Sequence, residues 1–361
     1  MKYLGAGWET FDRSPRLNQA MRGWPAAVIL LTLACSQTGQ PAAAKSSTSR
    51  VAVASPSPVQ GDLPLSRVSF TCRLPISIPP PADGQVHPST TGFLAFPSTS
   101  VTIDPKGNAG HYFDRAFSRW LPVGRQAVSP DGTHYAFTDL GQQDQFVIHI
   151  VEVASGQDHA VPIAASASGI MPQNIVFDYA AEGIYLVQAF EGPIPGMWLF
   201  DPKTGSIRQV TKVQVEVNAG RGIFWFDDLN PADPNPVRSA MRVLPNQIWR
   251  LELNSGHQVI WLDRPGTGVA VIGIDAHDRP LIRAVHDGRS NLDSTAELLL
   301  SLDDAKQQSI YKGPIAAGLS GGITDDHGVW FGSPQGIYLY SDANGLQKVS
   351  NQPGIPANGC F

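Results

Sequence analysis

Acidic side chains gather in four polar segments of the sequence that are longer than the turns around them. These segments cover residues 139–145, 191–196, 227–246 and 287–295. They carry the acids Asp139, Asp144, Glu191, Asp227, Asp228, Asp233, Asp287 and Asp293 and the bases Arg238, Arg242 and Arg289. Carboxylates in such excess can attract a metal cation or a basic partner segment, although ordinary solvated loops have the same composition. The eight acids and Arg238 are our candidate binding residues.

The other reactive residue types form no catalytic pattern. The nine histidines are scattered and show no zinc-binding spacing such as HExxH. No phosphate-binding loop or dinucleotide fingerprint occurs. Segment 227–246 lacks the alternating acids and the glycine of a calcium loop. We predict no catalytic residue, no resident metal and no cofactor, but a calcium ion held by single acids from separate repeats would leave no local pattern.

One serine stands between glycines, in the run Gly318–Gly322. A nucleophilic serine of this kind needs a sharp turn from a strand into a helix. No helix is expected after this run, so we do not predict a catalytic serine there. The chain carries 26 Lys and Arg against 31 Asp and Glu, which argues against a basic surface for nucleic acid.

The elements that position the acids repeat about every fifty residues. One hairpin recurs with its turn glycine at Gly156, Gly205, Gly256 and Gly345. A second hairpin precedes each of these, with turns at Gly132, Gly183, Arg279 and Gly328. Two hairpins per repeat make four short strands, which is the pattern of a β-propeller blade. Glycine and proline, 35 and 30 of 361 residues, also favour short strands and tight turns over helices.

In a four-stranded blade, the connections between strands 2 and 3 all lie on one face of the propeller. The four acidic segments occupy these connections, so we expect them on a single binding face, whereas the tight turns lie on the opposite face. Five tryptophans recur within the strands, namely Trp198, Trp225, Trp249, Trp261 and Trp330. We interpret them as packing between blades, with a carbohydrate platform as the alternative.

The phrase AVSPDGTHYAFTD at residues 127–139 resembles the repeat of periplasmic TolB-like proteins, a WD40-like β-propeller family. The resemblance implies an all-β fold with a single propeller of four-stranded blades over residues 66–361. Five repeats are visible from residue 126 to 350, and residues 91–124 leave room for a diverged one. We expect six blades, with seven as the alternative.

The N-terminal region has the pattern of an export signal. An apolar run of about ten residues ends at Cys35 after a single nearby base, Arg22, which predicts a bacterial lipoprotein signal over residues 1–35 with Cys35 lipidated. Met21 is a better start for this signal than Met1. Residues 36–65 are rich in Ala, Ser and Pro and predict a disordered linker. The alternatives are an uncleaved anchor or a plain secretory signal.

The two remaining cysteines, Cys72 and Cys360, lie at opposite ends of the predicted propeller. An exported protein can keep a disulfide, and a closed ring brings its ends together, so we predict a Cys72–Cys360 bond, with two unrelated thiols as the alternative. The resulting prediction is a monomeric, membrane-tethered, extracytoplasmic module that binds a protein or peptide through its long-loop face. The alternatives are a calcium-dependent hydrolase or lactonase acting at the central channel, and a carbohydrate-binding module.

Overall fold

The computed structural model describes sixteen stretches of the chain. They are residues 59–60, 63–79, 90–107, 112–140, 146–163, 174–188, 196–211, 216–220, 223–228, 230, 232–234, 236–237, 243–253, 255–286, 295–302 and 306–361. All of them belong to the compact unit Ala54–Phe361. The predicted signal with Cys35 and most of the predicted linker lie outside the described residues. None of the described helices has the length and apolar character needed to cross a membrane.

The described elements are almost all antiparallel strands, as predicted, and they form seven sheets. The first sheet holds β26 (Ile355–Pro356), β2 (Cys72–Ile78), β3 (Thr90–Phe96) and β4 (Ser100–Ile103), in that spatial order. A small hairpin follows, with β5 (Tyr112–Asp114) and β6 (Arg119–Leu121). After the short 3-10 helix η1 (Arg125–Ala127) comes a sheet of β7 (His134–Leu140), β8 (Phe146–Glu152) and β9 (Asp158–Ile163).

The remaining sheets each contain four consecutive strands. One holds β10 (Asn174–Ala180), β11 (Gly183–Gln188), β12 (Met197–Phe200) and β13 (Ile207–Thr211). The next holds β14 (Glu216–Gly220), β15 (Ile223–Asp228), β16 (Gln247–Glu252) and β17 (Gln258–Asp263). It is followed by β18 (Gly268–Ile274), β19 (Pro280–Val285), β20 (Glu297–Ser301) and β21 (Gln307–Lys312). The last holds β22 (Ser320–Asp325), β23 (Gly328–Ser333), β24 (Gly336–Ser341) and β25 (Gly345–Ser350).

The backbone conformation of the tight turns between the third and fourth strands explains why they contain glycine. Gly156, Gly205, Gly256 and Gly345 have φ angles of 75°, 70°, 69° and 66°. A Cβ atom at any of them would meet nothing within 4 Å, so the left-handed backbone conformation alone selects glycine. The repeat of about fifty residues therefore marks real hairpins at the predicted places.

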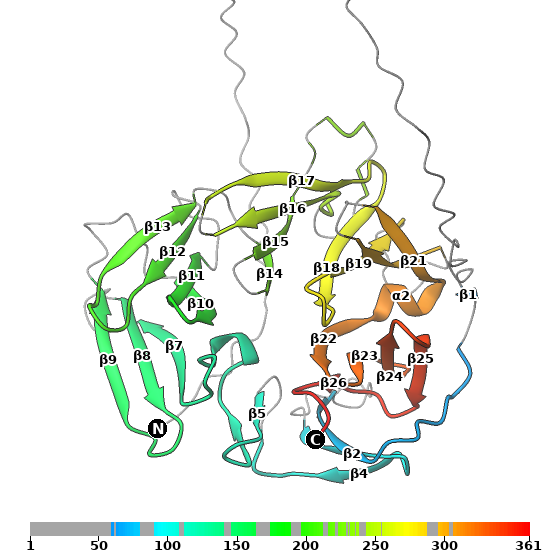
Figure 1. Ribbon diagram of the computed structural model, residues 1–361, viewed down its shortest axis with the longest axis horizontal. Coiled ribbons are helices and arrows are strands. Elements are labelled where there is room, and N and C mark those ends of the chain that lie inside the picture. The colour runs from blue at the N-terminus through cyan, green and yellow to red at the C-terminus, as the bar shows by residue number, and fades with distance from the viewer. Residues whose placement is uncertain are drawn as a thin grey trace, which may run out of the picture. The chain divides into compact units, whose positions relative to one another are not determined.

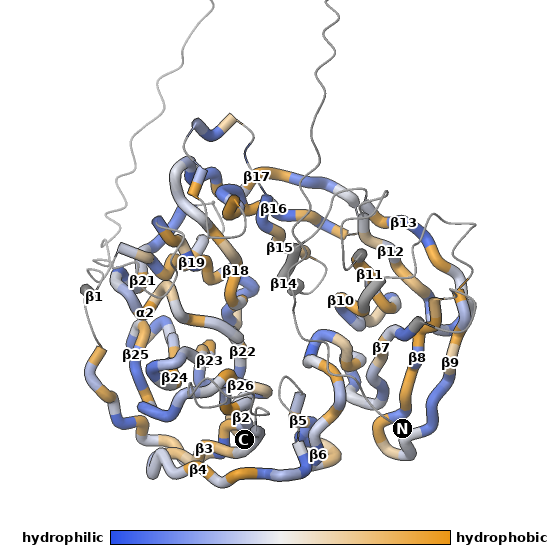
Figure 2. Tube along the Cα trace, turned by 180° about the vertical axis from the view of Figure 1, so that it is seen from behind, coloured by the Kyte–Doolittle hydropathy of each residue, from blue (hydrophilic) through white to orange (hydrophobic). Residues whose placement is uncertain are grey.

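The sheets are arranged in a ring (Figure 1). Buried hydrophobic clusters join β7–β9 to β10–β13, and so on in chain order through β22–β25 to the sheet of β2–β4. Hydrophobic and hydrophilic residues are interspersed around the ring (Figure 2). Nearly every residue of β12, β23 and β24 is buried, so both faces of these strands are packed. Trp198, Trp225 and Trp330 are at most 3% exposed, as the packing interpretation predicts. Trp249 and Trp261 pack at the edges of two clusters. This arrangement is a β-propeller.

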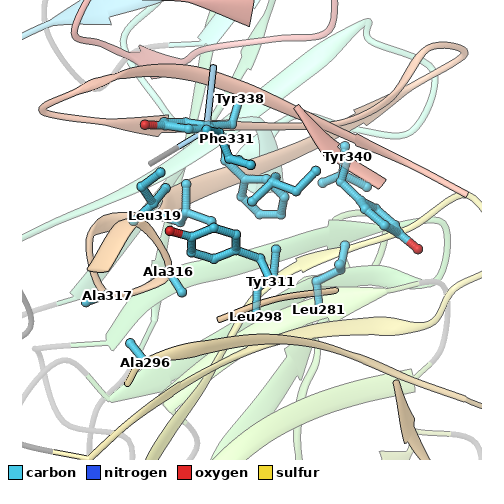
Figure 3. Close-up of a cluster of buried hydrophobic side chains, with 14 of the residues drawn as sticks. Leu281, Ala296, Leu298, Tyr311, Ala316, Ala317, Leu319, Phe331, Tyr338 and Tyr340 are labelled. Carbon is cyan, nitrogen blue, oxygen red and sulfur yellow. The ribbon is translucent and has the colours of Figure 1, made fainter. Parts of the chain in front are cut away.

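Between β18–β21 and β22–β25, the short helix α2 (Pro314–Gly318) completes one cluster. The ring of Tyr311 lies among side chains from α2 and the adjoining strands, including Ala316, Leu319 and Leu298 (Figure 3). Beside this cluster β22 approaches β18 closely at Gly322, where a Cβ atom would lie 2.3 Å from the backbone oxygen of Ile272. Glycine therefore allows these two inner strands to touch.

The two ends of the unit meet, as predicted. The C-terminal β26 pairs with β2, and Arg73 and Phe361 exchange two backbone hydrogen bonds. The predicted disulfide between Cys72 and Cys360 is confirmed, with a Cα–Cα distance of 5.6 Å.

The segment before β2 runs beside the last two sheets. Its strand β1 (Val59–Gln60) pairs in parallel with β21, and Leu65 forms a parallel bridge to Lys348. Leu63 is 9% exposed and belongs to the cluster around α2. Ordered contacts therefore begin some residues before position 66, where we placed the start of the propeller.

Candidate functional site

Four of the nine predicted binding residues lie in the part of the chain that the structure describes. Asp139 is exposed near the end of β7, and Asp228 is exposed at the end of β15. Asp227 and Asp233 are half-buried. The other five, Asp144, Glu191, Arg238, Asp287 and Asp293, lie outside the described residues. Asp139, Asp227 and Asp228 lie where connections between neighbouring strands begin, and Asp233 lies within such a connection.

Asp233 helps to fasten its long connection to the sheet. Its Oδ2 accepts hydrogen bonds from Asn246 Nδ2 at 2.6 Å and from the backbone N–H of Gly266 at 2.8 Å. The Oδ1 of Asn246 in turn accepts from the backbone N–H of Asn230 at 2.6 Å. One of the predicted binding acids therefore positions the described part of segment 227–246.

Asp227 lies within electrostatic reach of a cation that the sequence analysis missed. Arg283 on β19 is half-buried, and its Nη1 donates to the backbone oxygen of Leu319 at 3.0 Å. Burial lowers the pKa of Arg283, and the negative charge of Asp227 opposes that effect. Arg283 gave no sequence signal because it stands in an otherwise apolar strand, PLIRAV.

The serine at position 320 is not placed as a nucleophile. The run Gly318–Gly322 reads G-L-S-G-G, so it does match the bare G-x-S-x-G pattern. Helix α2 precedes Ser320, however, and strand β22 follows it, which is the reverse of the order that a nucleophilic elbow needs. The Ser320 hydroxyl points to the backbone oxygen of Gly332 at 3.5 Å, and the glycines serve the close strand contact.

One group of three potential metal ligands occurs among the described residues: Asp275, His277 and Asp342. A guanidinium already occupies its carboxylates. Arg279 donates through Nε to Asp275 Oδ2 at 2.7 Å and through Nη2 to both oxygens of Asp342 at 2.9 and 3.0 Å. A metal ion would have to displace this cation, so the group acts as an ion-paired link between two sheets.

A cleft of about 900 Å3 lies between the β7–β9 and β10–β13 sheets. One wall comes from the turn that precedes β7 and from the ends of β8 and β9. The other wall comes from residues 179–183 and 201–203. These are the ends of the sheets that carry the tight turns, so the cleft lies away from the long connections that we predicted as the binding face.

Three carboxylates on the cleft walls share an arrangement in which one oxygen is held and the other is not. Oδ1 of Asp131 accepts from Ser129 Oγ at 2.6 Å, Thr133 Oγ1 at 2.7 Å and the Thr133 N–H at 3.0 Å. Tyr185 OH donates to Glu182 Oε1 at 2.6 Å. Ser155 Oγ donates to Glu152 Oε2.

The second oxygen of each carboxylate, Asp131 Oδ2, Glu152 Oε1 and Glu182 Oε2, accepts no hydrogen bond from the described residues. The hydrogen bonds from Ser129 and Thr133 also hold the pKa of Asp131 at about 2, so this carboxylate is anionic at any physiological pH. Fixed anionic oxygens of this kind are acceptors prepared for a cation.

The floor of the cleft is less polar than its rim. Ile150 is 7% exposed and belongs to the hydrophobic cluster between the two sheets. Tyr179 is half-buried, and both burial and the charge of Asp131 raise the pKa of Tyr179. Lys203 and His159 are exposed on the walls. The cleft therefore combines an apolar floor with a rim in which acids outnumber bases.

Comparisons with known proteins do not assign a family. No family model matches the chain, and no curated protein matches it. Solved structures similar to it include an acylaminoacyl peptidase from Pyrococcus horikoshii, 10% identical over 78% of this chain and 46% of that one, with a TM-score of 0.39. This chain thus spans about half the length of that peptidase.

Two other similar structures are a TolB protein and a β-propeller domain. TolB from Acinetobacter baumannii is 12% identical over 80% of this chain and 67% of that one, with a TM-score of 0.40. The β-propeller domain of the Trilobed protease from Pyrococcus furiosus is 11% identical over 78% and 86%, with a TM-score of 0.40. Similarity this low says nothing of activity, and the fold assignment rests on the strand pairing and the closed ring described above.

Proposed function

We propose that this chain is a binding module and that the cleft between β7–β9 and β10–β13 receives a cationic segment of a protein or peptide. The oxygens of Asp131, Glu152 and Glu182 that accept no hydrogen bond from the described residues carry this proposal. A cleft of this volume is within the range of ligand sites. A basic side chain suits it because its alkyl stem can lie on the apolar floor while its charged end meets the carboxylates.

We also propose that the propeller has six blades. Val128 forms an antiparallel bridge to Tyr135, which adds an inner strand to β7–β9 and makes that sheet four-stranded in pattern. Each of the other large sheets then forms one blade, and the first takes its inner strand from β26. The hairpin β5–β6 is an addition between the first two blades. A seven-bladed ring would need this two-stranded hairpin to count as a full blade.

The cellular setting stays a prediction from sequence. We propose that the module is exported, that lipid on Cys35 tethers it to the extracytoplasmic side of a membrane, and that it acts as a monomer. The long-loop face, with Asp139 and Asp228 exposed, is the competing location for the partner. A calcium-dependent hydrolase and a carbohydrate-binding module stay open as alternatives from the sequence.

Titration calorimetry with synthetic decapeptides tests the binding function. A lysine- and arginine-rich peptide should bind, a glutamate-rich peptide of the same length should not, and added salt should weaken the binding. The variant Asp131→Asn/Glu152→Gln/Glu182→Gln should weaken it by at least about 10-fold, because three charge contacts are lost together. Its melting temperature is measured alongside, since Glu182 also holds Tyr185.

A matched control removes acids from the other face. Asp139→Asn/Asp228→Asn should leave the affinity for the basic peptide unchanged. If this control variant loses binding while the cleft variant keeps it, the partner site is the long-loop face and the proposal for the cleft is wrong. If neither peptide binds the unaltered protein, the proposed function itself is wrong.

A further inference from the structure

We infer that the hairpin β5–β6 docks this protein onto a membrane surface that carries anionic lipid. In the six-bladed ring proposed above, this hairpin belongs to no blade. The docking residues are Arg73 on β2 and Arg115, Phe117 and Arg119 in the hairpin, and we call them the arginine surface. None of them lines the cleft, so docking does not depend on the binding proposed there.

Aromatic packing holds the base of the hairpin. The ring centroid of Phe113 lies 4.8 Å from that of Phe93 on β3 and 5.2 Å from that of Trp120. Nε1 of Trp120 also donates to Oδ2 of Asp104, just after β4, at 3.0 Å. The hairpin turn is therefore carried on a rigid base beside the first sheet (Figure 1).

The hairpin turn places an apolar ring between two arginines. It reads Arg-Ala-Phe-Ser-Arg from Arg115 to Arg119. The ring of Phe117, at its centre, belongs to a side chain that is 40% exposed. Oδ1 of Asp114 accepts the backbone N–H of Phe117 at 2.9 Å, and Ser118 has a left-handed φ of 49°, so the turn has a defined shape. The fold thus fixes an aromatic side chain at the surface between two cations.

The arginines of this surface contact aromatic rings and not carboxylates. Cζ of Arg119 lies 5.9 Å from the ring centroid of Phe117. Cζ of Arg115 lies 5.4 Å and Cζ of Arg73 lies 5.8 Å from the ring centroid of Phe361. Within the described part of the chain, none of the three guanidinium groups forms a hydrogen bond or an ion pair.

The acids near the arginine surface are used by the fold. Asp104 accepts the hydrogen bond from Trp120, and Asp114 is 3% exposed and caps the hairpin turn. The terminal carboxylate of Phe361 forms no ion pair with a described residue. The positive charge of the surface is therefore available to an anionic partner.

A lipid surface matches both parts of this chemistry. Lipid phosphates accept hydrogen bonds from guanidinium groups, while an aromatic ring can enter the boundary between headgroups and acyl chains. The predicted lipid on Cys35 stands 24 positions before β1, and that length of chain spans at most roughly 80 Å. A tether of this length keeps the membrane at a high effective concentration, so a small contact surface is sufficient.

The net charge of the chain opposes adsorption, but it acts at longer range. The formal charge is −5, which repels an anionic surface. Charges further from the lipid than a Debye length of about 8–10 Å are largely screened at physiological salt. The three arginines therefore dominate at contact, and they orient the molecule with β5–β6 toward the lipid.

Vesicle co-sedimentation tests this contact on the full chain in a Cys35→Ser background, so that no lipid anchor contributes. The probes are phosphatidylcholine vesicles with and without about one-third phosphatidylglycerol. The protein should partition at least about 10-fold more strongly into the anionic vesicles, and added salt should weaken this partition. Equal partition into both vesicles overturns the inference.

A matched pair of variants assigns the contact to the hairpin. Arg115→Gln/Phe117→Ser should lower partition into anionic vesicles by at least about 10-fold, because a cation and an inserted ring are lost together. Arg208→Gln/Ile260→Ser removes an exposed arginine and an exposed apolar side chain from β13 and β17, and it should change nothing. Both variants keep the same N-terminal region, so its contribution cancels, and their melting temperatures are compared. No loss in the first variant, or equal losses in both, overturns the inference.

An environment-sensitive label shows which part of the protein meets the lipid. In the Cys35→Ser background, Ala116→Cys in the hairpin turn or Gln209→Cys on β13 provides a single reactive thiol for an NBD dye. Anionic vesicles should brighten and blue-shift the dye at position 116 and leave the dye at position 209 unchanged. The inference is wrong if position 116 does not respond, or if the glutamate-rich decapeptide changes its signal while vesicles do not, since the partner is then an acidic protein segment.

Discussion

Removal of the Cys72–Cys360 bond should destabilise the propeller mainly through its unfolded state. In the folded protein the two ends stay joined without the bond, because β26 pairs with β2 and Arg73 exchanges backbone hydrogen bonds with Phe361. The double variant Cys72→Ser/Cys360→Ser should therefore fold to the same ring. What it loses is the constraint on the unfolded chain, which the disulfide closes into a loop over a sequence separation of 288 residues.

The chain-entropy model gives about 5–6 kcal/mol for closing a loop of this length. Measured losses on removing native disulfides are usually about 2–5 kcal/mol, because real unfolded chains keep some structure. We therefore expect the free energy of unfolding to fall by about 3–5 kcal/mol. For a propeller of this size, with roughly 2 cal/mol/K of unfolding entropy per residue, that corresponds to about 5–8 °C in Tm.

Urea unfolding followed by tryptophan fluorescence measures the loss, in a Cys35→Ser background so that only this pair is changed. The variant should also show a larger dependence of unfolding free energy on urea, since its unfolded state exposes more surface. Reductant should lower the stability of the disulfide-bonded protein and leave the variant unchanged. A loss below about 1 kcal/mol with no effect of reductant would show that ring closure does not depend on the bond, and the entropic reasoning would be refuted.

Three further predictions concern single features of the fold. Burial, followed by the negative charge of Glu182, raises the pKa of Asp178 on β10 from 3.8 to about 6, so its charged form destabilises the folded state. The free energy of unfolding should therefore fall as pH rises from about 4 to about 6. In urea titrations, Asp178→Asn should raise the free energy of unfolding by about 1–3 kcal/mol at pH 7.5 and leave it unchanged at pH 4. A gain that does not depend on pH would contradict this prediction. Gly322→Ala should lower the free energy of unfolding by about 1–3 kcal/mol, because its Cβ would lie 2.3 Å from the backbone oxygen of Ile272. The control Gly318→Ala should be near neutral in the same assay, because the nearest atom to its Cβ would be 3.6 Å away. Millimolar calcium or excess EDTA should leave Tm unchanged, because Arg279 already neutralises Asp275 and Asp342; a clear rise with calcium would favour the calcium-dependent alternative instead.

The repeated hairpins could be predicted from the sequence because their turns need a left-handed backbone conformation, which favours glycine. Gly156, Gly205 and Gly256 keep the left-handed conformation at the same point of successive sheets, so their spacing survives even where the strands diverge. The hairpin β5–β6 has no such marker, and β26 is only two residues long. Their pairing depends on where the two ends of the propeller chain meet, and no local sequence pattern indicates that.

The cleft could not be predicted in the same way, because it belongs to two consecutive sheets. Asp131 and Glu182 are 51 positions apart and become neighbours on one cleft only after the sheets pack. The long connections drew attention through their length and excess of acids, yet the described carboxylate of Asp233 fastens its own loop. A count of charges cannot tell an acid that is used by the fold from one that is left for a partner.

The phrase that carried the family resemblance, AVSPDGTHYAFTD, contains one of the cleft carboxylates. Asp131 looks like a turn residue there, and it is one, but a carboxylate has two oxygens and the turn uses only Oδ1. Capping orders the Asp131 side chain in advance, and the same hydrogen bonds hold its pKa at about 2, so the carboxylate is already fixed and anionic. Turn chemistry and binding are therefore compatible at one residue.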